Sequence, residues 1–440
     1  MGLQSKKGVL CTVLVNLSRL VLALVLVFSG FVKAVDPKGT MYKLQEYADA
    51  FSVELFSADW LLFFAIVLAT VEFLIGVFLF LGVYRRTVSM AVFVVFLLFT
   101  PFTLYVAVSD AVSDCGCFGD AIGMSNWESF FKNLFLFLLS LAVFMGRRRF
   151  VFGMSVKNRW MAILFSAFYI SVVQGISLSY IPILDFRNYA VGNNLRELVQ
   201  GELDTYRVLL TYEKNGEKRE FAQDSLPDST WLFVESRSEL VSEGRKPVIG
   251  DFAILDWESD YDMAEDILAD TGFVFMMVAE SLDEASVGRV DRINELYDYC
   301  LEHDIIFCAA TSSDETDIQL WRKRTGAEYP VYWADYMLLR NIVRANPGML
   351  LMKNGAIVGK WNVGNMPDVE QMMSQGGSER LAKNAVYGID GKVFWSLLFV
   401  LPLLVIVLLD MATGHRKKLA KTEPVDEVDT ASAEKNNTVE

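Results

Sequence analysis

The sequence predicts a membrane all-α bundle joined to an α/β domain that lies outside the membrane. Three observations support this prediction. Hydrophobic residues make up 53% of the 440-residue chain, and they gather in six runs of about 20 residues, the length that crosses a bilayer as a helix. Basic residues flank these runs in an alternating order. Between the fifth and sixth runs, short apolar strands alternate with helical stretches, which is typical of an α/β layer fold.

Each of the six apolar runs is predicted to be a transmembrane helix. The segment from Leu61 to Leu81 carries one charge and the segment from Trp395 to Leu409 carries none, so buried helices of a soluble protein are a poor alternative. The predicted spans are 9–32, 59–83, 87–108, 127–146, 160–181 and 393–410.

The charges that flank the spans predict the orientation of the chain. With six spans, every basic cluster falls on one side, which the positive-inside rule assigns to the cytoplasm. We therefore expect a multi-pass protein of a bacterial inner membrane with both termini cytoplasmic. Residues 33–58, 182–392 and the loop around Cys115 would lie on the outer side. The clusters are Lys6 with Lys7, Arg85 with Arg86, Arg147 to Arg149 with Lys157 and Arg159, and Arg416 to Lys418.

The first span is expected to remain in the protein rather than to be removed as a signal peptide, because it is long and carries Arg19 in its middle. After it, Leu44, Tyr47, Ala48 and Phe51 recur at helical spacing. They predict a short amphipathic helix at the outer membrane surface.

Two charges stand out inside the predicted spans, Arg19 in the first and Glu72 in the second. Charged residues in hydrocarbon are costly and tend to face a partner or a cavity. We expect an Arg19–Glu72 ion pair, either as a structural tie or as part of a quinone or proton path. Arg19 and Glu72 are therefore candidate cofactor-binding residues, with a membrane quinone as the candidate cofactor.

The pair Cys115 and Cys117, separated by Gly116, lies in a polar break between two spans. A one-residue spacing gives a small, strained disulfide ring, and Gly116 lets the backbone close it. Such a bond suits thiol–disulfide exchange, with Cys115 and Cys117 as catalytic residues. A structural disulfide and a metal site remain alternatives, although two cysteines supply only half of a closed zinc site. Asp114 and Asp120 flank the pair, and their negative charge disfavours a thiolate.

The membrane half resembles the DoxX/MauE family over roughly residues 10–146. This resemblance implies a four-helix membrane bundle and a role in thiol–disulfide or quinone-linked redox processes. The methylamine-utilisation members are thought to help form disulfides in a periplasmic partner. The residues that carry it are Arg19, Phe28 to Lys33, Asp36 to Gly39, Tyr47, Glu72 with Gly76, and Cys115 to Asp120.

The segment before the last span is predicted to form an α/β domain. It shows strands at 273–279 and 305–310, helices at 290–302 and 315–325, and a hairpin around Lys353 to Gly355. This order resembles the thioredoxin fold, with Pro347 in the place of its cis-proline. The first strand is followed by Glu280-Ser281-Leu282 and not by a Cys-x-x-Cys pair. We therefore expect a non-catalytic docking domain.

Two further cysteines, Cys300 and Cys308, each lie on an apolar face. Core packing, a structural disulfide and a redox relay are the alternatives for them. The preceding segment 185–249 is predicted to be rich in β-strands, with a hairpin around Asn215 and Gly216 that either stands alone or extends the sheet.

The predicted function is thiol–disulfide exchange through Cys115 and Cys117, so the chain would act as a thiol–disulfide oxidoreductase. Its partners would be the lipid bilayer and a periplasmic protein thiol or disulfide; nucleic acid is not expected, because topology explains the basic clusters. The alternatives are a non-catalytic scaffold for an envelope complex and, less favoured, a transporter. The predicted segments are 1–146 (DoxX/MauE-like domain), 147–184 (fifth span), 185–249 (β-rich extension), 250–390 (thioredoxin-like domain), 391–415 (sixth span) and 416–440 (disordered cytoplasmic tail).

Overall fold

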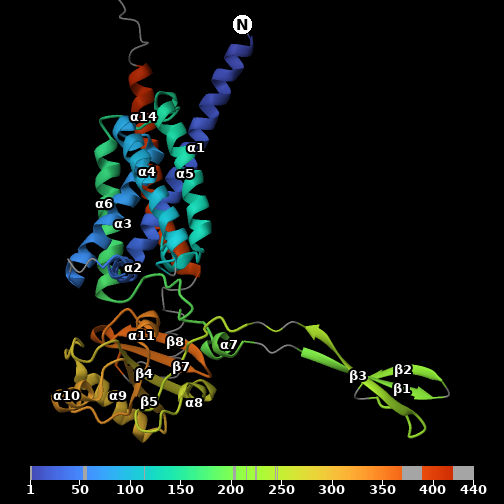
Figure 1. The fold of residues 1–440 in the computed structure, drawn as a ribbon. Helices are drawn as coiled ribbons and strands as arrows, with labels where there is room; N and C mark the ends of the chain where they lie inside the picture. The colour runs from blue at the N-terminus through green and yellow to red at the C-terminus, as the bar shows by residue number, and fades with distance from the viewer. Residues whose placement is uncertain are drawn as a thin grey trace, which may run out of the picture. The chain divides into compact units, whose positions relative to one another are not determined.

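The computed structural model divides the chain into two units, Met1–Leu178 with Ile389–Glu440, and Ser179–Gly388. Figure 1 shows the helices of the first and the two sheets of the second. The predicted disordered tail falls mainly outside the described residues, beyond a helix that continues to Leu419. The structure describes residues 2–52, 57–112, 114–201, 205–214, 216–222, 225–242, 244, 246–368 and 389–419.

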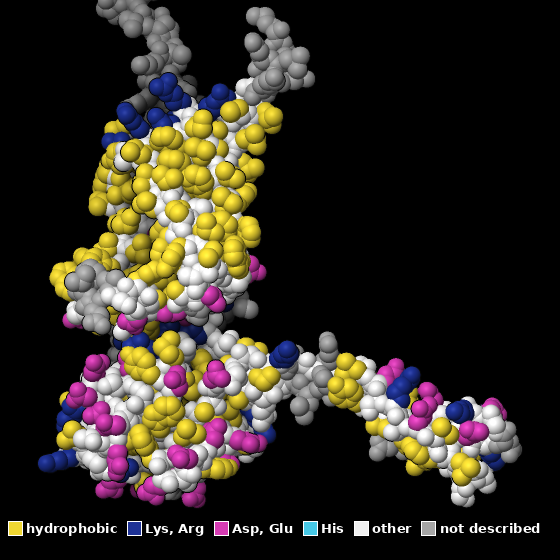
Figure 2. All heavy atoms as spheres, in the orientation of Figure 1, with side chains coloured by type: hydrophobic (Ala, Val, Ile, Leu, Met, Phe, Trp, Pro, Cys, Tyr) yellow, Lys and Arg dark blue, Asp and Glu magenta, His cyan; other side chains and the backbone are white. Residues whose placement is uncertain are grey.

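The first unit is a bundle of membrane-spanning helices, as predicted. Six helices have the length and apolar composition to cross a membrane, and Figure 2 shows hydrophobic side chains over the visible face of this unit. The helices are α1 (Gly2–Val35), α2 (Pro37–Ala50), α3 (Ala58–Leu81), α4 (Arg85–Ser109), α5 (Asn126–Gly146), α6 (Arg159–Ser179) and α14 (Ile389–Leu419), with short 3-10 turns η1 (Gly119–Ala121) and η2 (Arg147–Arg149).

Helices α1 and α3 pack closely because each places a glycine at their contact. A Cβ atom on Gly30 would lie 2.4 Å from the backbone nitrogen of Phe73. A Cβ atom on Gly76 would lie 2.7 Å from the backbone nitrogen of Val27. Small residues at helix contacts are a common device in membranes, because close packing there replaces the hydrophobic effect.

A methyl group at this contact is expected to separate the two helices. Gly30→Ala should lower the stability of the bundle by about 1–3 kcal/mol, the usual cost of overpacking. Gly8→Ala on the same helix is the control, since its Cβ would meet nothing within 4 Å. Thermal unfolding of the purified full chain should show a lower midpoint for Gly30→Ala only. Equal midpoints for both variants would contradict this account of the α1–α3 contact.

Helix α2 is the predicted short amphipathic helix, and its ends follow from its sequence. Asp36 caps it by accepting a hydrogen bond from the backbone N–H of Gly39 at 2.8 Å. Pro37 occupies the first turn, where the missing N–H costs nothing. Met41 packs against Leu61 and Ala65 at the start of α3, so α2 lies against the end of the bundle.

The last helix, α14, is held in the bundle by a buried carboxylate. Asp410 accepts a hydrogen bond from the backbone N–H of Ser155 at 3.0 Å and another from the side-chain amide of Asn158 at 2.9 Å. The Tyr169 hydroxyl on α6 donates to the Trp395 carbonyl at 2.9 Å. These contacts join α14 to α6 and to the loop before α6, although α14 and α6 are far apart in the sequence.

The second unit contains a five-stranded sheet in the order β6-β5-β4-β7-β8. Strands β4, β5 and β6 are parallel, β7 runs antiparallel to β4, and β8 runs antiparallel to β7. The Asn346–Pro347 bond before β7 is cis. This order and the cis-proline are those of a thioredoxin-like fold, as predicted. The elements are α7 (Leu195–Gln200), α8 (Ala264–Ala269), β4 (Phe273–Ala279), α9 (Val290–Glu302), β5 (Ile306–Thr311), α10 (Glu315–Thr325), β6 (Val331–Trp333), α11 (Tyr336–Ile342), β7 (Gly348–Lys353), β8 (Ala356–Asn362) and η3 (Val363–Asn365).

Each face of this sheet carries its own apolar core, which decides the state of the two cysteines. Cys308 belongs to the core on one face, with α8 and α11, and Cys300 to the core on the other, with α9 and α10. Both thiols are free, and burial raises the pKa of each to about 12. Core packing is therefore their role in this structure, and they form neither a disulfide nor a reactive thiolate.

The predicted β-rich extension forms a sheet of its own in the order β2-β1-β3. Its strands are β1 (Thr205–Lys214), β2 (Glu217–Ala222) and β3 (Leu232–Ser242); Asn215 of the predicted turn lies outside the described residues. The segment before this sheet packs instead against the five-stranded sheet. Tyr189 and Leu195 belong to the core of the α/β domain, so this domain begins earlier in the chain than the sequence pattern indicates.

A buried charge cluster also ties this earlier segment to β8. Lys360 donates to Asp185 at 2.8 Å and to the Tyr189 carbonyl at 2.9 Å. Arg187 donates to both oxygens of Asp185. Burial alone would raise the pKa of Asp185, but the positive charges of Lys360 and Arg187 hold this pKa well below its usual value.

Loss of the carboxylate is expected to leave Lys360 buried without its anionic partner. Asp185→Asn should lower the stability of the α/β unit by about 3–5 kcal/mol, the cost of breaking a buried pair. Because the folded pKa of Asp185 lies below the unfolded one, its contribution is present above about pH 4 and is lost as pH falls further through the folded pKa. Limited proteolysis of the full chain measures this, with the exposed Glu217→Gln as control. Equal resistance of both variants would contradict the prediction.

Candidate functional site

Cys115 and Cys117 form a disulfide in the loop between α4 and α5. The loop begins at Asp110, which ends α4 in a left-handed conformation. The side-chain amide of Asn126, at the start of α5, donates to the Asp110 carboxylate at 3.0 Å and to the Val112 carbonyl at 2.9 Å. The ends of both helices therefore hold this loop.

Gly116 gives the loop its turn. Its φ of +60° lies in the left-handed region that favours glycine. Its N–H donates to the Asp114 carboxylate at 2.7 Å, and its carbonyl accepts from the Gly119 N–H at 3.1 Å. A Cβ atom here would also lie 2.7 Å from Cγ of Lys43 on α2. Glycine between the cysteines is thus required by conformation and by space.

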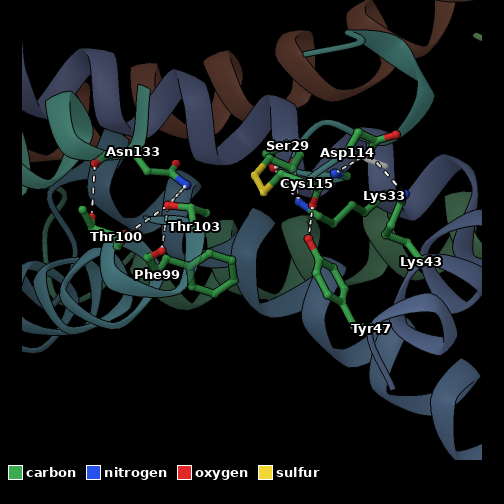
Figure 3. The surroundings of a disulfide bond; sticks show 12 residues. Ser29, Lys33, Lys43, Tyr47, Phe99, Thr100, Thr103, Asp114, Cys115 and Asn133 are labelled. Atoms are coloured by element: carbon green, nitrogen blue, oxygen red, sulfur yellow. Dashed lines mark hydrogen bonds and ion pairs between the residues drawn. A yellow bond between two sulfur atoms is a disulfide. The ribbon is translucent and has the colours of Figure 1, made fainter. Parts of the chain in front are cut away.

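The backbone of both cysteines is anchored to the neighbouring helices. Figure 3 shows Tyr47, Ser29 and Lys33 beside the disulfide. The Tyr47 hydroxyl on α2 donates to the Cys115 carbonyl at 3.0 Å. On α1, the Ser29 hydroxyl and the Lys33 ammonium each donate to the Cys117 carbonyl at 2.7 Å. Burial and nearby carboxylates raise the pKa of Tyr47, so its hydroxyl remains a donor at neutral pH.

Lys33 joins the disulfide loop to a carboxylate inside the bundle. Besides the Cys117 carbonyl, its ammonium donates to Ser29 at 2.6 Å and to Glu72 at 2.9 Å. These three acceptors use all three N–H groups of a charged lysine. The expected Arg19–Glu72 ion pair is therefore wrong: the partner of Glu72 is Lys33.

The packing of α1 against α3 explains this difference. Gly30 lies opposite Phe73, which brings Lys33 beside Glu72. Arg19 lies 14 residues before Lys33, or about 21 Å away along the helix. Its guanidinium donates to the Phe152 carbonyl at 2.9 Å and lies 4.7 Å from the centre of the Phe150 ring. Arg19 thus ties α1 to the segment after α5 and does not reach the Cys115–Cys117 loop.

The two cysteines differ in exposure. Cys115 is 8% exposed and counts as buried, whereas Cys117 is only half-buried. Phe118, which follows, is buried against Phe28 with ring centres 5.5 Å apart. A molecule that approaches the disulfide from outside therefore meets Cys117 more readily than Cys115.

Lysines from three helices surround this loop. Lys33 comes from α1, and Lys43 from α2 pairs with Glu46 at 2.6 Å and with Asp114 at 3.3 Å. Lys132 from α5 places its ammonium 4.2 Å from the centre of the Phe118 ring. The negative charge of Asp114, expected to disfavour a thiolate, is thus offset by Lys43.

The corresponding position of the α/β domain holds no cysteine and is closed by hydrogen bonds. After β4, Glu280 pairs with Arg340 at 2.7 Å. The side-chain amide of Asn346, beside the cis-proline, donates to the Ser281 carbonyl at 2.8 Å. Polar partners therefore fill the place where a thioredoxin carries its cysteine pair. In the described part of the chain, no group of three His, Cys, Asp or Glu residues could hold a metal ion.

The residue pattern points to the cysteine pair and Glu72, whereas Ser29, Lys33 and Lys132 join the candidate site only through the structure. Lys33 fell just outside the predicted first span, whereas α1 continues to Val35. Ser29 and Lys33 are four residues apart, on one face of a helix. Lys132 lies within the predicted fourth span, where any charge signals a function or a partner.

The helices and the loop define a polytopic membrane protein that carries a disulfide at one end of its bundle. More specifically, residues 11–146 match the family model described as methylamine utilisation protein MauE. This part of the chain is therefore a MauE-like membrane domain. Residues 206–243, which hold the three-stranded sheet, match a domain of unknown function (DUF8463).

Comparison with solved structures gave a match to a solution structure described as a candidate protein disulfide isomerase from Bacteroides thetaiotaomicron. The two share 17% sequence identity and a TM-score of 0.23, and the match covers 30% of this chain and 94% of that one. No curated protein gave a significant match. The thioredoxin-like assignment rests on the strand order and the cis-proline described above.

Proposed function

We propose that the protein exchanges disulfides with partner proteins through Cys115 and Cys117 on the outer side of a bacterial inner membrane. The single observation that carries this proposal is the disulfide between these residues, held in a half-buried loop by Tyr47, Ser29 and Lys33. Anchoring through the carbonyl groups fixes the loop whether the sulfur atoms are bonded or reduced. The MauE-like domain and the thioredoxin-like domain both fit a membrane disulfide role.

In the proposed reaction, a partner thiolate attacks Sγ of Cys117, and the S–S bond breaks with the electron pair going to Cys115. A second partner thiolate then attacks the mixed disulfide and releases Cys117. The partner dithiol loses two electrons and two protons; Cys115 and Cys117 gain the two electrons, and the protons pass to the reduced pair and to water. The reverse sequence of steps reduces a partner disulfide.

For reoxidation we propose a membrane quinone, which would take the two electrons of the reduced pair and two protons from the pair and the surrounding water. The supporting observation is the position of the disulfide beside the Lys33–Glu72 ion pair at the end of the membrane helices. Glu72 belongs to this proposal. Arg19 does not, because its partners lie with the segment after α5.

The α/β domain is proposed to bind the partner rather than to react with it. Its sheet follows the thioredoxin order, while the position after β4 carries the Glu280–Arg340 pair. A scaffold that binds envelope proteins without chemistry is the competing proposal, and the same domain would serve it.

Oxidation of a reduced dithiol peptide separates these two proposals. The purified, fully oxidised chain should convert about one equivalent of peptide dithiol to disulfide, and catalytic amounts should suffice once a water-soluble quinone is added. The double variant Cys115→Ser with Cys117→Ser should be inactive. The double variant Cys300→Ser with Cys308→Ser is the matched control and should remain active. Peptide oxidation that does not depend on Cys115 and Cys117 would leave only the scaffold role.

A further inference from the structure

Lys132 approaches the disulfide loop from α5 without a carboxylate partner. It lies in the second turn of that helix and is half-buried. Its contact with the loop is the Phe118 ring, directly after Cys117. Lys132 also lies within electrostatic range of Lys33 and Glu72. A half-buried lysine in a membrane span is costly unless a negative charge accompanies it.

The charges on this side of the loop do not balance when the disulfide is intact. Glu72 is bonded by Lys33, and within the described ranges Lys132 forms no ion pair. Two cations therefore face one carboxylate. On the side of the loop that faces α2, the charge of Lys43 is matched by Glu46 and Asp114. Asp120 lies exposed in η1. The hydroxyl of Tyr47 stays neutral. The unmatched charge is thus positive and lies over the ring of Phe118, the residue after Cys117.

We infer that Lys132, together with Lys33, stabilises the thiolate of Cys117 that forms when the disulfide is reduced. This inference rests on the proposed function and deepens it. When a partner dithiol reduces the disulfide, Cys115 takes one proton, Cys117 remains a thiolate, and the second proton passes to water. Two cations then face two anions, Glu72 and the Cys117 thiolate.

A stabilised thiolate gives the reaction a direction. Stabilisation of the reduced form raises the reduction potential of a disulfide and so makes it a stronger oxidant. The Cys115–Cys117 pair is therefore poised to accept electrons from partner thiols, so that it forms disulfides in them. A lowered proton affinity also makes Cys117 the better leaving group when the partner resolves the mixed disulfide. Lys132 acts here as a positioning residue, through charge alone.

The pH dependence of Cys117 alkylation tests this inference. In the full chain with Cys115→Ser, iodoacetamide labelling of Cys117 is followed by peptide mass spectrometry from pH 4 to 10. Adding Lys132→Met should raise the midpoint of labelling by about one pH unit, the usual effect of removing one nearby opposite charge. Lys132→Arg keeps the charge and should restore the midpoint. Arg148→Met, an exposed cation after the other end of α5, should leave it unchanged.

The outcomes are separable from those of the proposed function. If Lys132→Met does not fold, the labelling midpoint of Cys117 is measured in Lys132→Gln instead. A midpoint that stays within 0.2 pH unit in both neutral variants overturns the inference, even if exchange with partners is observed. A midpoint that rises in the neutral variants and returns with Lys132→Arg supports it, even if no partner is found.

Discussion

Cys115→Ser is expected to accumulate a mixed disulfide with a partner protein in living cells, whereas Cys117→Ser is not. Cys117 is half-buried and Cys115 is buried, so a partner sulfur reaches Cys117 more readily. In Cys115→Ser the Cys117 thiolate attacks a partner disulfide, whose S–S bond breaks with the electron pair going to the second partner sulfur. Cys115 is then missing to resolve the mixed disulfide from within the loop. Acid quenching, alkylation and nonreducing gels should show at least several-fold more adduct for Cys115→Ser.

The control for this experiment is Cys11→Ser in the Cys115→Ser background. Cys11 is an exposed free cysteine on α1, and its removal should leave the adduct unchanged. Adducts that accumulate in Cys117→Ser instead would contradict the assignment of Cys117 as the contact residue. Adducts that vanish with Cys11→Ser would show that the cysteine loop is not their source.

Lys33→Met is expected to destabilise the bundle and to release the disulfide loop. The change leaves the Glu72 carboxylate without its cation and the Cys117 carbonyl without one of its two donors. Loss of one partner of a buried ion pair costs about 3–5 kcal/mol. The midpoint of thermal unfolding, followed by tryptophan fluorescence in detergent, should fall clearly below that of the unaltered chain.

A double variant separates the stability of the ion pair from its effect on the loop. Lys33→Met with Glu72→Leu removes both charges and should recover most of the lost stability, because an apolar pair often replaces a buried ion pair without cost. The rate of disulfide exchange should stay low, since the anchor from Lys33 to Cys117 is still missing. The part-exposed Lys43→Met is the control and should cost no more than about 1 kcal/mol. A single variant as stable as the double variant would contradict the role of the pair.

Much of the fold could be predicted because its signals are local. Apolar runs of 20 residues define the spans, and the hairpin around Asn354 and Gly355 follows from turn chemistry. The early start of the α/β domain could not be predicted in this way. Leu195 joins its core through a backbone hydrogen bond to Gly355, 160 residues later in the chain, and such a contact depends on the tertiary structure.

In the candidate site, too, residues with a local signal could be predicted and those that depend on tertiary contacts could not. The cysteine pair and the intramembrane Glu72 stand out by residue type alone, so they could be predicted from the sequence. The partner of Glu72 depends on which turns of α1 and α3 meet, and the close approach of Gly30 to Phe73 sets this register. Hydropathy identifies the two helices but carries no information on their register. For this reason the sequence predicts Arg19 as the partner of Glu72, whereas the structure shows Lys33.

The central claim is that Cys115 and Cys117 cycle between disulfide and dithiol, and their redox state in growing cells tests it most directly. Rapid acid quenching, labelling with one alkylating reagent, reduction and labelling with a second give the oxidised fraction by mass spectrometry. The account predicts a mixture of both forms, which becomes more reduced when quinone reoxidation is blocked. A pair that stays fully oxidised in every condition, like a structural staple, would contradict the claim.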